Sequence, residues 1–193
     1  QLTPASSALA MTSGCSPQRM MLASKYGDRT AFLTKFNPDV QRELCSDAEE
    51  CYFGDYPTLT HIRLAYGNNA PVMWLVPQLY NLSEYCGCKG KLEGKPLEEC
   101  AHIISMEFHY LKVSELMLFF YRFKTGRYGR FYGTVDPLII TESLRMFCDE
   151  RSSAYTHHEQ EQREQREAEQ RKLAIPYDEY LRHKNETIKN TNV

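Results

Sequence analysis

The sequence lacks any long hydrophobic run and any strong excess of one charge. Its longest dense apolar run, Leu116 to Tyr121, is far shorter than the roughly 20 apolar residues that a membrane-spanning helix needs. The net charge is only −2 over 193 residues. No global attraction to nucleic acid follows, so any such binding must come from a local patch. We expect a soluble, cytoplasmic protein without membrane contact.

The sequence also lacks the motifs of common enzyme classes. It has no Gly-x-Ser-x-Gly elbow, no Walker A loop, no Gly-x-Gly-x-x-Gly turn and no His-Glu-x-x-His pair. His61, His102 and His109 fall within expected helices, where each can be a hydrogen-bonded core histidine. Glu107 and Glu115 flank apolar helices, and we expect both on solvated faces. We therefore expect no enzymatic activity and no cofactor.

A secretion signal is a further absence. The segment Leu2 to Gly14 is weakly apolar but has no basic start, so it does not resemble a signal peptide. Because the chain starts at Gln1, we expect its native start to be missing or trimmed. The seven cysteines are odd in number and irregularly spaced, unlike a secreted disulfide framework, which predicts reduced thiols.

Some of these thiols raise the alternative of a zinc site. Zinc in structural sites takes four Cys or His ligands, and pairs of ligands usually have two or more residues between them. Here each pair has one residue between its members, and one thiol lies on the apolar stripe of an expected helix, where it can be a small hydrophobe. We therefore expect no metal, and a structural zinc module is kept as a minor alternative with the candidate ligands Cys86, Cys88, Cys100 and His102.

What the sequence does contain is a succession of helix signals. Apolar residues recur at helical spacing, with no strand–helix alternation and no internal repeat. This predicts an all-α fold, a small helical bundle with a Gly/aromatic loop and an extended charged C-terminal helix. We expect a flexible N-terminal arm over residues 1–26, a helical globular domain over 27–151, and a charged helical extension and tail over 152–193.

Prolines, glycines and capping residues delimit the expected helices. Tyr52 to Pro57 is predicted to be a turn, and Pro77 should kink its helix or mark the true start. Because apolar residues surround the helix that follows Ser114, we expect it at the centre of the core, with Ser114 as its cap. The expected helices are Arg29 to Phe36, Pro38 to Cys45, Thr58 to Tyr66, Pro71 to Tyr85, Pro96 to Tyr110, Glu115 to Lys124, and one that starts at Pro137.

The stretch Phe119 to Gly133 combines basic and aromatic side chains and contains no acid. Arg and Lys contact phosphates, and flat aromatic faces stack on unpaired bases, so this mixture suits nucleic acid. Its glycines force turns, and the segment can form a short hairpin or a loop. The alternative is that the aromatics are core and the cations form the solvated face around them. The candidate nucleic-acid-binding residues are Arg122, Lys124, Arg127, Tyr128, Arg130 and Tyr132.

The segment Thr156 to Lys172 consists almost entirely of His, Gln, Glu and Arg. Pairs four residues apart with the acid first, such as Glu159 with Arg163 and Glu167 with Arg171, favour a helix. No apolar heptad runs through it, so it is not a coiled-coil seam by itself. Such a helix can be a partner-binding arm or simply a solvated helix.

Five phrases between about residues 45 and 151 carry a family resemblance. They are Gly54-Asp-Tyr-Pro-Thr-Leu59, Ala65-Tyr-Gly67 with Trp74-Leu75, Leu111-Lys-Val-Ser-Glu-Leu-Met-Leu-Phe-Phe120, Gly126-Arg-Tyr-Gly-Arg-Phe-Tyr-Gly133 and Val135-Asp-Pro137. Together they resemble a group of small uncharacterised helical proteins encoded by bacteriophages and mobile elements of gut-type bacteria. The phrase Phe-Tyr-Gly-x-x-Asp-Pro137, before a helix that ends in Asp149-Glu-Arg151, is also similar to phage replication proteins of the helicase-loader kind.

The resemblance implies a role in mobile-element DNA metabolism, with DNA and a replicative helicase as possible partners. Without an ATP-binding loop, the chain can resemble only a loader or adaptor that has no ATPase of its own. We therefore expect a non-enzymatic accessory protein of phage or mobile-element DNA replication. The alternative is a protein-interaction or regulatory module that does not bind nucleic acid. No oligomeric state is predicted.

Overall fold

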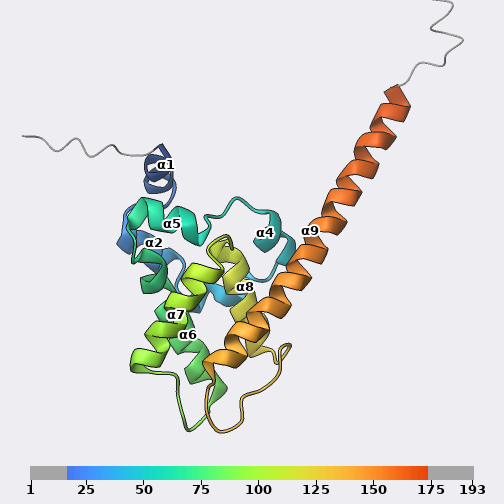
Figure 1. Ribbon diagram of the computed structural model, residues 1–193. Coiled ribbons are helices and arrows are strands. Elements are labelled where there is room, and N and C mark those ends of the chain that lie inside the picture. The colour runs from blue at the N-terminus through green and yellow to red at the C-terminus, as the bar shows by residue number, and fades with distance from the viewer. Residues whose placement is uncertain (1–16, 174–193) are drawn as a thin grey trace, which may run out of the picture. The chain divides into compact units, whose positions relative to one another are not determined.

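The computed structural model describes residues 17–173. Over these residues the chain is all-α, with two isolated β-bridges and no strand, which confirms the predicted fold class. The described residues divide into two units, with the boundary between Asp149 and Glu150. The helices are α1 (Pro17–Tyr26), α2 (Arg29–Lys35), the 3-10 helix η1 (Pro38–Val40), α3 (Gln41–Leu44), α4 (Ala48–Phe53), α5 (Leu59–Tyr66), α6 (Ala70–Cys86), α7 (Gly94–Glu107), α8 (Val113–Lys124) and α9 (Pro137–Leu173) (Figure 1).

Helix α8 lies at the centre of the first unit. Helices α3, α4 and α6 all pack against it, and α7 packs along α6 (Figure 1). Burial on every side requires apolar residues around the whole helix, and the sequence supplies them. This confirms the prediction that this helix forms the centre of the core. Its buried residues are Val113, Ser114, Glu115, Leu116, Met117, Leu118, Phe119, Phe120 and Phe123.

The start of α8 corrects two sequence-based predictions. The helix begins at Val113, and Ser114 does not cap it, because the Ser114 hydroxyl donates to the Cys51 carbonyl at 2.7 Å. Glu115 was expected on a solvated face but is fully buried. Its Oε2 accepts a hydrogen bond from the Lys112 N–H at 2.8 Å. A carboxylate here satisfies an N–H that the helix leaves without an internal partner and complements the helix dipole.

Helix α6 continues through Pro77, where the sequence predicts a kink or a helix start. Pro77 and Met73, whose carbonyl loses its usual partner, are both exposed, so water can replace the missing bond. On the buried side, Trp74 Nε1 and Gln78 Nε2 both donate to the Phe36 carbonyl at 2.8 Å. These two bonds attach the end of α2 to the middle of α6.

Residues 17–26, predicted as part of a flexible arm, form helix α1, which packs on α5. The Tyr26 side chain is buried, and its hydroxyl donates to the Asp55 carbonyl at 3.1 Å. Lys25 Nζ donates to that carbonyl and to Asp55 Oδ2, both at 2.7 Å. The sequence pattern of α1 is a weak helix signal, and tertiary contacts of this kind can supply the stability that local propensity lacks.

The second unit, in its described part, is α9 from Glu150 onward, and most of its side chains are exposed. Arg171 Nη2 lies 3.7 Å from Glu167 Oε2, as the acid-first spacing predicts. Arg163 pairs with Glu167 at 3.0 Å and not with Glu159. Despite the length of α9, none of the helices within residues 17–173 is long and apolar enough to cross a bilayer.

Candidate nucleic-acid interface

Two glycine-rich loops lie together at one end of the first unit. The first, residues 87–93, follows α6, and the second, residues 125–136, follows α8. Figure 1 shows both at the lower end of the helical body. A parallel bridge between Gly90 and Thr134 joins them. We call the joined segments the paired loops.

Two backbone hydrogen bonds join the paired loops, and one bond to a side chain anchors the first loop. The Gly90 N–H donates to the Gly133 carbonyl at 3.0 Å, and the Val135 N–H donates to the Gly90 carbonyl at 2.8 Å. Nearby, the Leu92 N–H donates to the Ser83 hydroxyl at 2.8 Å, which ties the first loop to α6. The two loops therefore have a defined register, although neither contains a strand.

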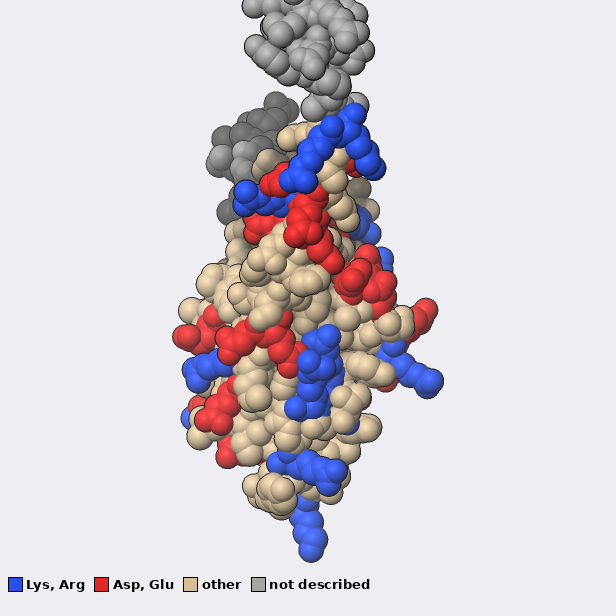
Figure 2. Space-filling view, turned by 90° about the vertical axis from the view of Figure 1, so that its right-hand side faces the viewer, with Lys and Arg blue, Asp and Glu red and all other residues tan. Residues whose placement is uncertain are grey.

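The bridge brings basic side chains from two parts of the sequence to one end of the protein. Lys89 in the first loop and Arg127 and Arg130 in the second are exposed. Lys91 pairs with Glu84 at 2.5 Å, whereas neither Lys89 nor Arg130 has a carboxylate partner within residues 17–173. Figure 2 shows Lys and Arg side chains at this lower end, with Asp and Glu mostly above it. The paired loops therefore form a small basic surface.

The aromatic residues of the second loop have different environments. The Tyr128 ring is 7% exposed and packs on Phe119 and Phe123, with centroids 5.5 and 6.1 Å away. Phe131 stacks on Phe123 at 5.2 Å. Tyr132 is 88% exposed. The predicted stacking role on a base therefore suits Tyr132, but not Tyr128, whose ring belongs to the core.

Arg122 and Lys124, predicted to meet phosphates, are half-buried and bonded to neighbouring helices. Arg122 Nη1 donates to the Tyr52 hydroxyl at 2.6 Å, and its guanidinium lies over the Tyr52 ring. Lys124 Nζ donates to Gln41 Oε1 at 2.6 Å and to Asn81 Oδ1. Burial lowers the pKa of Lys124, because desolvation disfavours its charged form. These two cations connect helices of the body, and Lys124 also lines a hollow of about 300 Å³ next to Arg130 in the second loop.

The structure thus divides the predicted set in two. Arg127, Arg130 and Tyr132 lie on the exposed surface of the paired loops, whereas Arg122, Lys124 and Tyr128 serve the core, as the alternative interpretation of this stretch holds. Sequence reasoning missed Lys89. The sequence signal for Lys89 was the alternation of lysine and glycine in the loop between α6 and α7. Only the Gly90–Thr134 bridge, however, places Lys89 beside the second loop.

The candidate zinc ligands do not converge. Cys100 is 1% exposed and faces the core, and burial raises its pKa to about 12, which disfavours the thiolate that binds zinc. His102 on the same helix is exposed, and Cys86 and Cys88 are half-buried. Within residues 17–173, no three His, Cys, Asp or Glu side chains are grouped to hold a metal ion.

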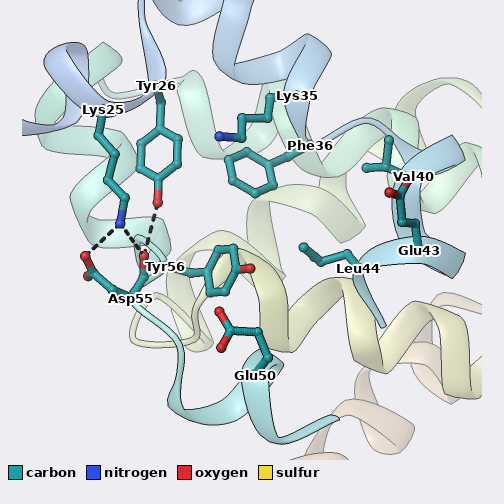
Figure 3. A pocket seen from close by; sticks show the side chains of 10 residues that line it. All are labelled: Lys25, Tyr26, Lys35, Phe36, Val40, Glu43, Leu44, Glu50, Asp55 and Tyr56. Carbon is teal, nitrogen blue, oxygen red and sulfur yellow. Dashed lines mark hydrogen bonds and ion pairs between the residues drawn. The ribbon is translucent and has the colours of Figure 1, made fainter. Parts of the chain in front are cut away.

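A separate hollow of about 490 Å³ lies among α1, α2, α3 and α4 (Figure 3). Its walls are aromatic, and Lys35 Nζ lies 5.1 Å from the centre of the Tyr26 ring. Figure 3 shows Lys35 on one side of the hollow and Glu50 on the other, next to Tyr56. Because groups of both charges face it, this hollow favours no ligand of a single charge, unlike the paired loops.

The fold and the site define an all-α protein whose described core surrounds α8 and whose paired loops expose a small basic surface. By sequence, the chain belongs to a family of unknown function, DUF6633, whose profile matches residues 94–191. The match contains α7, α8, the second loop and α9, and leaves out α1–α6 and the first loop. No curated protein and no solved structure matches the chain.

Proposed function

We propose that the protein binds single-stranded nucleic acid at the paired loops, as a non-enzymatic accessory protein of phage or mobile-element DNA metabolism. The supporting observation is the exposed Tyr132 beside the exposed cation Arg130, in a loop that the Gly90–Thr134 bridge joins to Lys89. The biological setting and a replicative helicase as a further partner come from the sequence resemblance.

The chemistry of the site favours a single strand over a duplex. Arg and Lys contact phosphates on either form, but an exposed aromatic ring can stack only on a base that is not already stacked within a duplex. Tyr132 offers such a ring on a loop whose flanking glycine lets the backbone come close to the strand. Since few cations are present, the number of phosphate contacts should be small.

The test is fluorescence anisotropy of a labelled single strand and a labelled duplex over a salt series. We expect tighter binding of the single strand, with a slope in log–log coordinates of about 0.7 for each phosphate contacted. In the variant Arg127→Glu/Arg130→Glu, we expect a large loss of affinity for the single strand and a much weaker dependence of the remaining affinity on salt. A matched variant, Arg29→Glu/Arg42→Glu, changes the net charge equally at two exposed arginines outside the paired loops and should bind as the wild type does.

Two outcomes contradict the proposal. Equal losses in both double variants would mean that only net charge matters, and no binding at low salt would remove the nucleic-acid function. The circular dichroism of both variants controls for folding. It should stay unchanged, because all four side chains are exposed.

A second candidate function is a protein-interaction arm formed by α9 from Glu150 onward. The observation that favours it is the family match, which includes this entire charged segment and extends to residue 191. Its described ion pairs, such as Arg163–Glu167, stabilise the helix without an apolar stripe, so a partner would be contacted through charged side chains.

Deletion of residues 150–193 tests this second function. Because most side chains of residues 150–172 are exposed, the truncated chain should melt cooperatively, close to the full chain. Binding to nucleic acid at the paired loops should persist. If the arm is the interaction site, co-purification from the native host should lose specific partners on truncation, and recovery of every partner by the truncated chain would exclude it.

A further inference from the structure

A groove of about 300 Å³ separates α7 from the first part of α9, residues 137–149. Its floor is apolar, because Cys100 and Phe108 are 1% and 6% exposed. Its two sides are formed by Ile103 on α7 and Leu138 on α9, which are 50% and 69% exposed. We call it the α7–α9 groove. All of its lining residues lie in the first unit and within the region that the family profile matches.

The same two helices carry further exposed apolar side chains outside the groove lining. Met106 follows Ile103 at helical spacing on α7 and is 61% exposed, and Met146, about two turns after Leu138 on α9, is 53% exposed. Soluble domains expose single apolar side chains routinely, but contiguous rows of them mark interaction sites. Methionine adapts its shape to a partner surface. Each of the two helices therefore exposes two large apolar side chains, one that lines the groove and one outside its lining.

The rim of the groove is mainly acidic. Three glutamates line it, Glu99, Glu107 and Glu142, against one cation, Arg145. Glu99 Oε1 lies 3.6 Å from Lys95 Nζ, one turn earlier on α7, which is a long distance for an ion pair. Glu107 and Glu142 pair with no cation within residues 17–173. An apolar floor with an acidic rim is complementary to a ligand that presents apolar anchors with basic groups beside them.

We propose that the α7–α9 groove docks an amphipathic helical segment of a partner protein, with large apolar residues on one face and Lys or Arg beside them. The volume of about 300 Å³ lies at the lower end of the range usual for small-molecule pockets, about 300–1,000 Å³, and accommodates one or two large side chains of a partner as anchors. A helix laid between α7 and α9 would cover the exposed side chains of Ile103 and Leu138 at once, in the manner of helix-in-groove recognition. This interaction is independent of nucleic-acid binding at the paired loops.

The test uses the full chain and designed peptides of about 18 residues, roughly five helical turns. One peptide carries Leu at helical spacing with Lys at the flanking positions. A second replaces each Lys with Glu, and a third scrambles the apolar spacing. We expect the Lys peptide to bind more tightly than the other two. It should shift the methyl signals of Ile103, Met106, Leu138 and Met146 in NMR spectra.

Two variants locate the interaction. Leu138→Asp should weaken Lys-peptide binding about tenfold or more, the scale of an interface anchor, whereas Leu64→Asp, at an exposed leucine on α5, should not. Glu107→Lys/Glu142→Lys should reverse the preference between the Lys and Glu peptides. Both replaced leucines are at least half exposed, so all of these variants should keep the wild-type circular dichroism.

Three results would overturn the proposal. The first is a Lys peptide that binds no better than the scrambled one, and the second is a set of shifted methyl signals away from the groove. The third comes from sedimentation. If the wild type is a dimer that Leu138→Asp dissociates and Leu64→Asp does not, a second copy of this chain occupies the groove.

Discussion

Gly90 lies so close to Thr134 that a Cβ at position 90 would come within 2.4 Å of Thr134 Cγ2 and 3.4 Å of its Cα. Real Cβ atoms do not approach another atom to 2.4 Å, so any larger residue at position 90 would force the Thr134 side chain to shift, whereas glycine lets the two loops join as they are. The basic surface of the paired loops thus depends on one glycine from the first loop and one threonine from the second.

Gly90→Ala should separate the paired loops. Overpacking of a well-packed contact costs about 1–3 kcal/mol, and because both loops are peripheral, we expect a moderate decrease in melting temperature. Binding of single-stranded DNA should also weaken, since the bridge that holds Lys89 at the second loop is lost. Thr134→Gly removes the two side-chain atoms that would clash. The double variant Gly90→Ala/Thr134→Gly should therefore recover part of the binding, and failure to recover it would contradict this mechanism.

Tyr132→Ala should weaken nucleic-acid binding without affecting stability, whereas Tyr128→Ala should lower the stability of the fold. Tyr132 is exposed, so its loss should leave the melting temperature unchanged and reduce affinity for a single strand by about 1–3 kcal/mol, the value of one stacked base. Tyr128 is buried between phenylalanines, so its loss should destabilise the fold by about 3 kcal/mol. Thermal melts and anisotropy on the same samples separate the two roles. A Tyr132→Ala variant with wild-type affinity would exclude stacking at this position.

The Lys25–Asp55 pair should be visible in the pH dependence. The hydrogen bond from Lys25 lowers the pKa of the Asp55 carboxyl, and the same bond raises the pKa of Lys25. The stabilisation from Asp55 is therefore present above its unfolded pKa and is lost as pH falls through the lower folded pKa. That from Lys25 is lost as pH rises through its raised folded pKa. An NMR titration should place Asp55 below about 3.9, and Lys25→Met should return it to that ordinary value. An unchanged titration in Lys25→Met would show that the pair does not form.

Cysteine alkylation should distinguish buried thiols from a metal site. With a pKa of about 12 and almost no exposure, Cys100 should stay unmodified by iodoacetamide at pH 8 until the protein is unfolded. Cys88, which is half-buried, should react in the native state. Mass spectrometry of the digested protein measures both. Protection of Cys88 by added zinc would contradict the absence of a converging ligand set within the described residues.

Helix positions were largely predictable because their signals are local. The Thr58 hydroxyl accepts a hydrogen bond from the His61 N–H at 3.2 Å, and Gly67 ends the same helix with a φ of +104°. Both features lie within a few residues of the helix that they delimit, so the sequence shows them directly. Helix α4 was missed. It is only six residues long, and its last two residues, Tyr52 and Phe53, lie in the segment that was predicted as a turn, although Asp47 offers a local cap that accepts hydrogen bonds from the Glu49 and Glu50 N–H groups.

The candidate site was predictable only as a region. The sequence shows that basic and aromatic residues alternate from Phe119 to Gly133, but not which of them face solvent. That choice depends on partners far along the chain. Arg122 bonds to Tyr52, 70 residues away, and Lys124 bonds to Gln41, 83 residues away.

By itself, the sequence determined that this protein is helical, that α8 is its most buried helix and that a charged helix follows the body. These properties follow from spacing, capping and composition, which act within a few residues of each other. The tertiary structure alone decided that Glu115 and Tyr128 are buried, that Tyr132 is exposed and that Gly90 meets Thr134. Burial and loop pairing depend on which distant surfaces come together in space, and spacing along the chain carries no record of that.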